Sequence, residues 1–364
     1  MHHDWIGNTK TLKVLLLTRY GRLGASSRLR MLQFLPFLES KGIVCDVKPL
    51  LDDVLLRTKY LEARYRPSQM LGTYVSRLWE LIRRNRYNLI WIEKEALPWL
   101  PASLERFLLR GIPYVLDFDD ALFHHYDLHR SKAVRRLLGH RIDFLMAGAR
   151  LVIGGNDYLA ERARRAGAPW VEVLPTVIDR DRYPLHRPAR QDDVPRIVWI
   201  GSPSTIGYLA ALGASLAVLA KHVAFTLRVI GSTLEMPGVD VECVMWTEQS
   251  EAAAISECDI GIMPLKDSSW ERGKCGYKLI QYMACALPVV ASPVGVNTQI
   301  VRDGVNGLLA ASPEDWVAKL TQLLSDVPMR ERMGRAGREF VESEYCLQQI
   351  APRLANLLLK AGDR

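Results

Sequence analysis

Runs of aliphatic residues alternate with longer stretches of helical periodicity along most of the chain. In the first half, short apolar runs rich in β-branched residues predict strands, at residues 13–18, 43–47, 88–92, 113–117, 151–153 and 171–174. Helical patterns, with apolar positions three or four residues apart, occur at residues 26–40, 132–147 and 158–166. Strands and helices that alternate in this way are typical of βαβ units around a parallel sheet.

The alternation restarts after a segment without apolar periodicity, residues 183–195, which contains three prolines and the pair Asp192-Asp193. We interpret this segment as a linker between domains. Beyond it, strands are predicted at residues 197–200, 225–230, 260–263 and 288–291, and helices at residues 205–221 and 277–285. Three further helical patterns follow Pro313 with no strand between them.

The whole pattern predicts two doubly wound, Rossmann-like α/β domains. We expect a first domain at residues 1–188, a second at residues 189–345, and a last helix at residues 346–364 that packs back on the first domain. Ligands of open α/β sheets bind at the carboxyl ends of the strands. We therefore expect the two domains to face each other across a ligand-binding cleft.

Composition places the chain among ordinary folded proteins. Of its 364 residues, 49% are hydrophobic and 24% are charged, which excludes disordered and collagen-like chains. The longest apolar run near the N-terminus, residues 14–17, is far too short for a membrane span or a signal-peptide core. Six cysteines without a C-x-x-C pair indicate reduced thiols. We therefore expect a cytoplasmic protein without disulfides or a metal site.

Basic residues are concentrated in the first half of the chain. Residues 1–190 contain 32 Lys and Arg against 20 Asp and Glu, whereas residues 191–364 contain 16 against 20. Such asymmetry indicates that the first half faces a polyanion. Zinc-finger, RRM and KH signatures are absent, so we predict no nucleic-acid partner and favour an anionic membrane surface. A solvated basic surface is the alternative.

Arginines alternate with aromatic and aliphatic residues between positions 57 and 86. This pattern suits an interfacial membrane face, although core-facing helices with a solvated side would show it too. The predicted acceptor or membrane face consists of Arg28, Arg30, Arg64, Arg66, Arg83 and Arg84. We expect peripheral association of the basic first domain with the inner face of the cell membrane.

A glycine-containing loop follows the first predicted strand. Gly24 precedes a helix whose first turn contains Ser26, Arg28 and Arg30. Cations near a helix N-terminus oppose the helix dipole, while the free N–H groups there attract anions. The combination predicts an anionic ligand at this loop. A glycine-rich turn with solvated arginines is the alternative.

Cations also gather at the start of a helix in the second half. Lys274 and Lys278 flank Gly276, and Gln281 lies on the same helix face as Lys278. A diphosphate would contact the two lysines and the helix N–H groups, and a ribose hydroxyl would contact the glutamine amide. A plain basic loop is the alternative. The strand-to-helix turn at Gly201-Ser202 could also take an anion, but such turns are common in α/β folds.

Three carboxylates end the strand predicted at residues 113–117. Asp117, Asp119 and Asp120 would lie at the edge of the sheet where an active site is expected. Such a cluster could orient sugar hydroxyls, act as a base or bind a hard cation. Helix capping by Asp119 or Asp120 is the alternative.

Four ordered motifs in the second half resemble the nucleotide-sugar domain of family 4 retaining glycosyltransferases. They occupy residues 258–265, 278–291, 292–295 and 303–309, and residues 171–179 look like the family's segment before the linker. The resemblance implies a GT-B fold, with no cofactor beyond the nucleoside diphosphate sugar. It also implies a donor site made of Gly24, Gly201, Ser202, Met245, Trp246, Gly273, Cys275, Gly276, Tyr277 and Gln281.

The chain departs from the family's pattern at three places. Gly273 and Gln281 replace the two glutamates of the family's glutamate, seven residues, glutamate motif. The basic residues that commonly follow the first strand of this domain are missing from residues 202–208. An Asp119-Asp120 pair stands where the family commonly has His-Asp. We interpret these changes as those of a subfamily with its own donor, and a weakened enzyme is the alternative.

The resemblance implies retaining, metal-independent transfer of a hexosyl group from a nucleoside diphosphate sugar to a hydroxyl. Lys274 and Lys278 would stabilise the leaving diphosphate, and Asp119 and Asp120 complete the predicted catalytic set. The expected acceptor is a glycolipid or a lipid-linked intermediate of a surface polysaccharide. A GT-B sugar-nucleotide epimerase and a catalytically silent carbohydrate- or partner-binding module are the alternatives. The sequence does not identify the base, hexose, linkage or oligomeric state.

Overall fold

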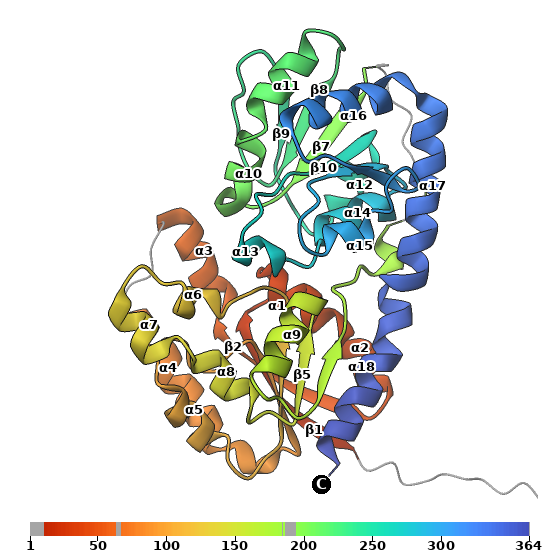
Figure 1. Cartoon of the computed structure of the whole chain (residues 1–364). Helices are drawn as coiled ribbons and strands as arrows, with labels where there is room; N and C mark the ends of the chain where they lie inside the picture. Colours follow the sequence, from red (N-terminus) through yellow and green to blue (C-terminus); the bar gives the residue numbers. More distant parts are fainter. Residues whose placement is uncertain (1–10, 63–66, 184, 186–193, 364) are drawn as a thin grey trace, which may run out of the picture. The chain divides into compact units, whose positions relative to one another are not determined.

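The computed structural model describes residues 11–62, 67–183, 185 and 194–363. The chain forms two compact units (Figure 1). Unit 1 contains the described residues up to Thr176 together with those from Ile350 onward, and unit 2 is Val177–Gln349. Each unit is built around one parallel sheet.

The sheet of unit 1 has the strand order β2-β1-β3-β4-β5-β6, and every pair of neighbours is parallel. All residues of β3, β4 and β5 are buried. Because both faces of a parallel sheet are covered by helices, its central strands are mostly apolar. The strands are β1 (Leu12–Tyr20), β2 (Ile43–Leu51), β3 (Leu89–Glu93), β4 (Tyr114–Phe118), β5 (Leu151–Gly154) and β6 (Val171–Val173).

The helices of unit 1 are shorter than the periodicity predicts. The pattern at residues 26–40 is interrupted by a 3₁₀ turn at Leu32–Phe34, because Pro36 permits only a new first turn there. The pattern at residues 132–147 breaks near Gly139. The helices are α1 (Ala25–Arg30), α2 (Leu35–Ser40), α3 (Asp53–Glu62), α4 (Pro67–Ile82), α5 (Ala102–Leu108), α6 (His124–Asp127), α7 (Lys132–Leu138), α8 (Arg141–Met146) and α9 (Asp157–Arg165).

The sheet of unit 2 has the order β12-β11-β10-β7-β8-β9 and is also parallel. Its two edge strands were not predicted. The sequence of β9 contains two acidic residues, and β12 is only three residues long. The strands are β7 (Arg196–Ile200), β8 (Thr226–Ile230), β9 (Asp240–Val244), β10 (Ile260–Met263), β11 (Val289–Ala291) and β12 (Gly307–Leu309).

The helices of unit 2 cover both faces of this sheet. The pattern predicted at residues 205–221 forms two helices, α10 and α11. A capping box of Ser312 and Asp315 begins α16. The helices are α10 (Ile206–Ala210), α11 (Gly213–Ala220), α12 (Glu251–Ser256), α13 (Ser269–Arg272), α14 (Tyr277–Ala284), α15 (Asn297–Ile300), α16 (Pro313–Ser325) and α17 (Val327–Glu344).

Within the described part of the chain, no single helix has the length and apolar composition needed to cross a membrane; the bent pair Pro203–Ala210 and Gly213–Ala220, at 56° to each other, meets these criteria only jointly.

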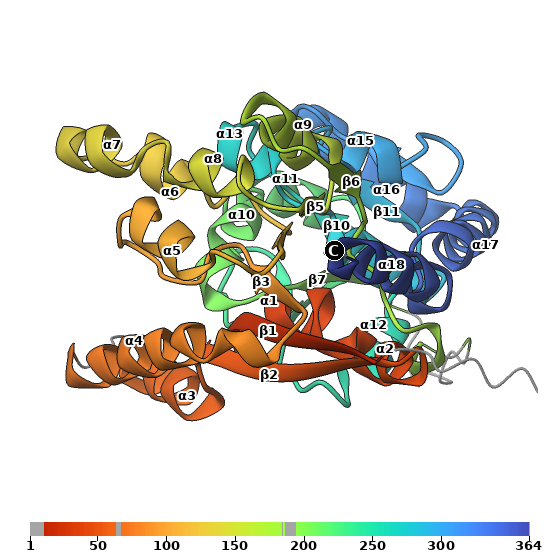
Figure 2. The same ribbon diagram turned by 90° about the horizontal axis from the view of Figure 1, so that it is seen from below.

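The chain passes between the units at Val177 and again at Ile350. The first passage lies ahead of the linker expected at residues 183–195, because Ile178 and Tyr183 are buried in the core of unit 2. The last helix, α18 (Leu347–Gly362), belongs to unit 1 from Ile350 onward. Figures 1 and 2 show α18 on one side of unit 1, and α4 and α5 on the opposite side.

Candidate functional site

Charged side chains gather at the carboxyl ends of the unit 1 strands. Strand β3 ends at Glu93, and Lys94 follows with a φ of 66°. Strand β4 leads into Asp119 and Asp120. Because parallel strands bring their carboxyl ends to one edge of the sheet, these residues lie together. A left-handed backbone conformation is uncommon at a lysine. It persists only where the surrounding structure enforces it.

Lys94 links the two predicted catalytic aspartates. Its Nζ lies 2.8 Å from Asp119 Oδ1 and 2.8 Å from Asp120 Oδ2, and its side chain is 5% exposed. Burial alone would lower the pKa of Lys94, but the charges of the two aspartates raise it above its usual value. Burial alone would raise the pKa of Asp119, yet Lys94 and a hydrogen bond from Ser26 keep it below its usual range. Asp119 is therefore a carboxylate at neutral pH.

The loop before α1 is packed tightly against its neighbours. Gly24 is the N-cap residue of α1, and a Cβ there would lie 2.2 Å from Cβ of Tyr20. The Leu23 amide donates to Asp53 Oδ1 at 2.9 Å. Packing thus explains Gly24 independently of any ligand. Its predicted role beside donor phosphates stays a prediction.

The predicted placement of Arg28 and Arg30 on an acceptor or membrane face is wrong. They are only 5% and 3% exposed. Arg30 donates to Asp117 Oδ1 from Nε at 2.9 Å and from Nη2 at 2.6 Å. The anion that compensates this helix cation is therefore Asp117 of β4. Arg28 donates to the backbone oxygen of Arg22 at 3.0 Å.

The other four arginines of this predicted face differ in their exposure and contacts, and two of them are not described by the structure. Arg64 and Arg66 lie outside the described residues. Arg83 is exposed, with its guanidinium 4.4 Å from the centroid of the Trp79 ring. Arg84 is partly buried and donates to the backbone oxygen of Arg110 at 2.9 Å.

In unit 2, two lysines lie over aromatic rings at the carboxyl ends of the strands. Lys278 Nζ is 4.4 Å from the Trp199 ring centroid, and Lys274 Nζ is 5.4 Å from that of Tyr208. Burial, with a smaller contribution from Lys274, lowers the pKa of Lys278 to about 7. Among the residues that the structure describes, no carboxylate lies within 4.0 Å of Lys278 Nζ. Two cations so placed can attract a polyanion.

The segment from Gly273 to Tyr277 carries these lysines into α14. Gly276 is the N-cap residue with a φ of 65°, and a Cβ there would lie 2.4 Å from Cδ1 of Ile300. No side chain caps this helix start, and a helix N-terminus favours an anion. Cys275 is buried, and Tyr277 packs against the core of unit 2.

Gln281 lies in a buried chain of hydrogen bonds. Its Nε2 donates to Tyr183 Oη at 3.2 Å. The Tyr183 hydroxyl donates to Glu251 Oε1 at 2.6 Å, and Trp246 Nε1 donates to Glu251 Oε2 at 2.6 Å. Gln281 and Trp246 are thus connected through two residues, whereas Met245 is 85% exposed. Their predicted contacts with ribose and base stay predictions.

The turn after β7 shows why small residues are needed there. A Cβ at Gly201 would lie 2.5 Å from the Trp199 ring, and one at Gly231 would lie 2.9 Å from Gly201 O. Ser202 Oγ lies 2.8 Å from Ser204 Oγ. Gly201, Gly231 and Trp246 therefore adjoin one another at this edge of the unit 2 sheet.

Comparison with known proteins decides the family. A model of the glycosyl transferase 4-like domain matches residues 46–177, and a model of the glycosyl transferases group 1 matches residues 194–326. One lies in unit 1 and the other in unit 2. The chain belongs to the group 1 glycosyltransferases.

Individual relatives of this group 1 glycosyltransferase support the assignment. A glycosyltransferase of Methanocaldococcus jannaschii that is itself uncharacterised is 33% identical over 104 residues, covering 27% of this chain and 28% of its own length. The chain spans about a quarter of the length of the curated relatives it matches.

Solved structures show that the fold is shared over nearly the whole chain. Sucrose-phosphate synthase from Thermosynechococcus elongatus has a TM-score of 0.72 at 15% identity, covering 96% of this chain and 98% of its own. The Anabaena protein HepE, solved in complex with UDP-glucose, also has a TM-score of 0.72 at 15% identity, with coverages of 96% and 100%. The expected α/β GT-B fold and the family resemblance are confirmed.

Sequence analysis of this group 1 glycosyltransferase missed several polar residues near the carboxyl ends of the strands in the two sheets. Lys94 stands in Glu-Lys-Glu directly after a buried strand, a signal equivalent to the one that identified Asp117–Asp120. Glu271 of α13 is 2% exposed and accepts hydrogen bonds from Ser268 and Tyr208. Its approach to Tyr208 joins positions far apart in sequence, and no local pattern indicates it.

Proposed function

We propose that this protein is a retaining glycosyltransferase that moves a hexosyl group from a nucleoside diphosphate sugar to a hydroxyl acceptor without a bound metal. The donor's nucleotide would bind at the carboxyl ends of the unit 2 strands. UDP-glucose in the HepE structure makes a nucleoside diphosphate sugar the first donor class to test.

The observation that carries this proposal is the placement of Lys278. An ammonium group there lies on Trp199, next to Lys274 and to the uncapped start of α14. Burial makes its charge unfavourable until an anion arrives. A diphosphate would supply that anion and would also accept hydrogen bonds from the helix N–H groups.

The same groups suit the proposed chemistry. As the bond to the anomeric carbon breaks, negative charge grows on the leaving diphosphate, and Lys274 and Lys278 would stabilise it there. The leaving phosphate would take the proton of the acceptor hydroxyl. In unit 1, Asp119 remains ionised because of Lys94. It therefore suits hydrogen bonding to sugar hydroxyls better than proton donation. Asp120, with a side chain 28% exposed, is the first aspartate to substitute.

The proposed acceptor is a glycolipid or a lipid-linked intermediate of a surface polysaccharide. Unit 1 would bind it, with the protein at the inner face of the cell membrane. The excess of basic residues in the first half of the chain supports this assignment, since anionic lipids attract clustered Lys and Arg.

Thermal-shift measurements against nucleoside diphosphates and their sugars test the donor site. A nucleotide at 100 times its Kd stabilises the protein by about 2.7 kcal/mol. We expect one nucleotide to raise the Tm of the wild type, and Lys278→Ala to weaken its binding about 10- to 100-fold, as expected for a hydrogen bond to a charged group. Lys221→Ala, an exposed lysine of unit 2, is the matched control.

The outcomes separate the proposal from the two alternatives. No shift with any nucleotide, in a folded sample, would favour a silent binding module. A shift with turnover to an isomeric sugar nucleotide would favour an epimerase. Transfer to an acceptor, with the product's anomeric configuration read by NMR, would establish both transfer and retention. Asp120→Asn should lower kcat more than it alters nucleotide affinity, because Asp120 lies in unit 1.

A further inference from the structure

The outer face of α4 carries a stripe of exposed apolar side chains. Its members repeat at intervals of four, four and three residues, which places them on one side of the helix. They are more than half exposed: Leu71, Val75, Trp79 and Ile82. The other side of the helix is buried, since Leu81 is 0% exposed and Arg77 is 3% exposed. A contiguous apolar stripe of this kind marks an interaction surface.

Arginines border this stripe and connect it to α5. The Arg83 guanidinium lies over Trp79, and the Arg84 side chain donates to the backbone oxygen of Arg110. The Arg110 guanidinium in turn lies 5.5 Å from the ring centroid of Phe107, which is 59% exposed. Arg84 and Arg110 therefore connect the end of α4, through Phe107, to α5.

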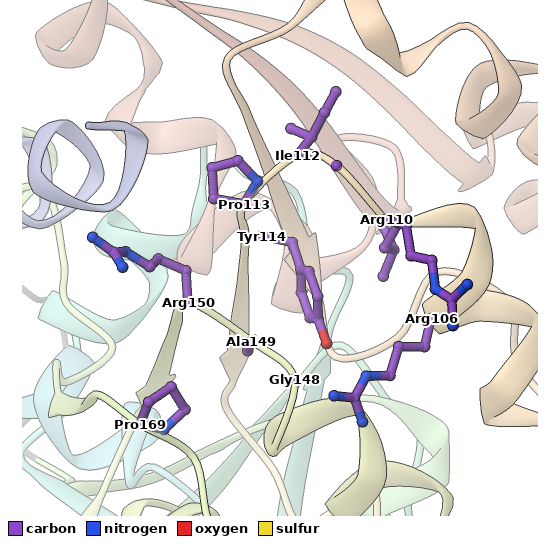
Figure 3. Close-up of a pocket in the computed structure, with 11 residues that line it drawn as sticks. Arg106, Arg110, Ile112, Pro113, Tyr114, Gly148, Ala149, Arg150 and Pro169 are labelled. Carbon is purple, nitrogen blue, oxygen red and sulfur yellow. The ribbon is translucent and has the colours of Figure 1, made fainter. Parts of the chain in front are cut away.

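A basic cavity opens beside Arg110, at the amino ends of β4 and β5. It has a volume of about 380 Å³ and is lined by Tyr114 and Gly148 among others. Figure 3 shows Arg106 and Arg110 on one side of it and Arg150 on the other. Among the residues that the structure describes, none of these three arginines forms an ion pair with a carboxylate. Guanidinium groups without an acidic partner suit a phosphate group.

We propose that the α4 stripe and this cavity form one docking surface for a membrane that contains anionic phospholipids. Leu71, Val75, Trp79 and Ile82 would enter the boundary between headgroups and acyl chains. Arg106 and Arg110 would hold a lipid phosphate. Membrane docking would bring the protein to a lipid-linked acceptor. In this respect the docking surface rests on the proposed function.

Charge favours a membrane over a second copy of the chain. A two-fold contact pairs the same surface patch on both subunits. Such a contact would place the patch that contains Arg83, Arg106 and Arg110 against the equally basic patch of the other copy. The nearby carboxylate of Glu80 already faces Lys48 and Arg86. An anionic lipid surface instead supplies the opposite charge over the whole area.

Sedimentation of the full chain with lipid vesicles tests the basic part of the surface. The wild type is expected to bind vesicles rich in phosphatidylglycerol and to bind pure phosphatidylcholine vesicles weakly. The triple variant Arg106→Gln, Arg110→Gln, Arg150→Gln should lose roughly a hundredfold in affinity, since each arginine near an anionic surface contributes about fivefold. A unit 2 variant with the same loss of charge, Lys221→Gln, Arg332→Gln, Arg335→Gln, should bind as the wild type does.

The apolar part needs a separate variant and readout. Trp79→Gln combined with Ile82→Gln should weaken binding to both kinds of vesicle. Brominated lipids should quench part of the wild-type tryptophan fluorescence, and Trp79→Phe should remove that part. Because Trp79 and Ile82 are exposed, an unchanged Tm would show that these variants fold.

Three results would overturn the docking surface: equal binding of wild type and triple arginine variant, an equal loss in the unit 2 control, or self-association that Trp79→Gln and Ile82→Gln abolish. Binding of soluble glycerol phosphate without binding of vesicles would overturn it as well. Nucleotide thermal shifts on the same samples keep the two proposals apart. Vesicle binding without any nucleotide shift contradicts the proposed function alone, and the reverse contradicts the docking surface alone.

Discussion

Single buried cations behave differently in the two units. In unit 1, Arg30 lies against Asp117, and Lys94 lies between Asp119 and Asp120. The positive and negative charges compensate each other, and removing one partner would leave a buried charge uncompensated. Lys278 of unit 2 is different, because its neighbours are an aromatic ring and another lysine. This contrast points to Lys278 as a residue that receives its counter-charge from a ligand.

The first prediction concerns the pH dependence of stability at Lys278. Its pKa is lowered from 10.5 to about 7, first by burial and then by Lys274. Between these values the unfolded chain binds a proton that the folded chain does not, so this group makes the free energy of unfolding rise with pH. Below pH 7 the whole destabilisation is present. Lys278→Met should therefore raise the Tm of the unliganded protein more at pH 6 than at pH 10.

Thermal denaturation of wild type and Lys278→Met at the two pH values checks this. Lys221→Met serves as the control, because Lys221 is exposed. A Tm difference that is the same at pH 6 and pH 10 would contradict the lowered pKa.

Among the elements, α14 shows how local backbone requirements position the site. Its N-cap, Gly276, has a φ of 65° and faces Ile300 at a distance that leaves no room for a side chain. In a residue other than glycine the left-handed backbone would be strained, and its side chain would also displace the start of the helix. Lys278 lies in the first turn, so such a displacement would move its ammonium group as well.

The second prediction follows from this geometry. Gly276→Ala should destabilise unit 2 by more than the roughly 1–2 kcal/mol expected for a left-handed alanine, and it should weaken nucleotide binding. Gly304→Ala is the matched control, because Gly304 has a φ of 78° and a Cβ there would meet no atom within 4 Å. Chemical denaturation and nucleotide titration of both variants check this, and equal losses in the two would contradict it.

Sequence patterns predicted the buried strands well and the element ends less well. Strands β3, β4 and β5 are buried along their whole length and mostly apolar, so their runs stand out. The break at Pro36 in the first helical pattern was predictable from proline alone. Edge strand β9 was missed although its sequence, Asp-Val-Glu-Cys-Val, alternates polar and apolar residues as a half-buried strand does. Burial of Arg30 was missed because its ion pair with Asp117, on a distant strand, has no local signature.

At the scale of the whole molecule, α18 completes unit 1 from the far end of the chain. Its buried side includes Leu354 and Leu358, both 0% exposed. A Cβ at Gly362 would lie 2.5 Å from Cδ1 of Leu12, and Arg353 pairs with Glu172 at 2.8 Å. These contacts join the last residues of the chain to the first and sixth strands.

The third prediction tests this contribution to unit 1. Leu358→Ala should cost about 2–5 kcal/mol of stability, as is usual when a buried leucine is truncated. Leu359→Ala, at a neighbouring position that is 37% exposed, should cost far less. Hydrogen exchange should show the loss of protection in unit 1, whereas protection of unit 2 should persist. Uniform loss in both units would contradict the assignment of α18 to unit 1.

The motifs that carry the sequence resemblance lie on and around α14 and β10 of unit 2, and the donor site expected there stays a prediction. The resemblance could not predict how the pattern's missing glutamates are accommodated. Gln281 turns inward to Tyr183, and Glu271 is held by Tyr208. Both contacts join residues more than 60 positions apart, so they depend on the completed fold.

The division of unit 1 between the two ends of the chain affects its synthesis on the ribosome. Domains generally fold as units while the chain emerges from its N-terminus. Unit 2 is one continuous segment, Val177–Gln349, and is fully translated before the residues from Ile350 onward. The later-made unit can therefore reach its native state first. Unit 1, most of which is made earlier, keeps part of its apolar surface uncovered until the residues from Ile350 onward have emerged, so the nascent chain depends on these residues to complete it.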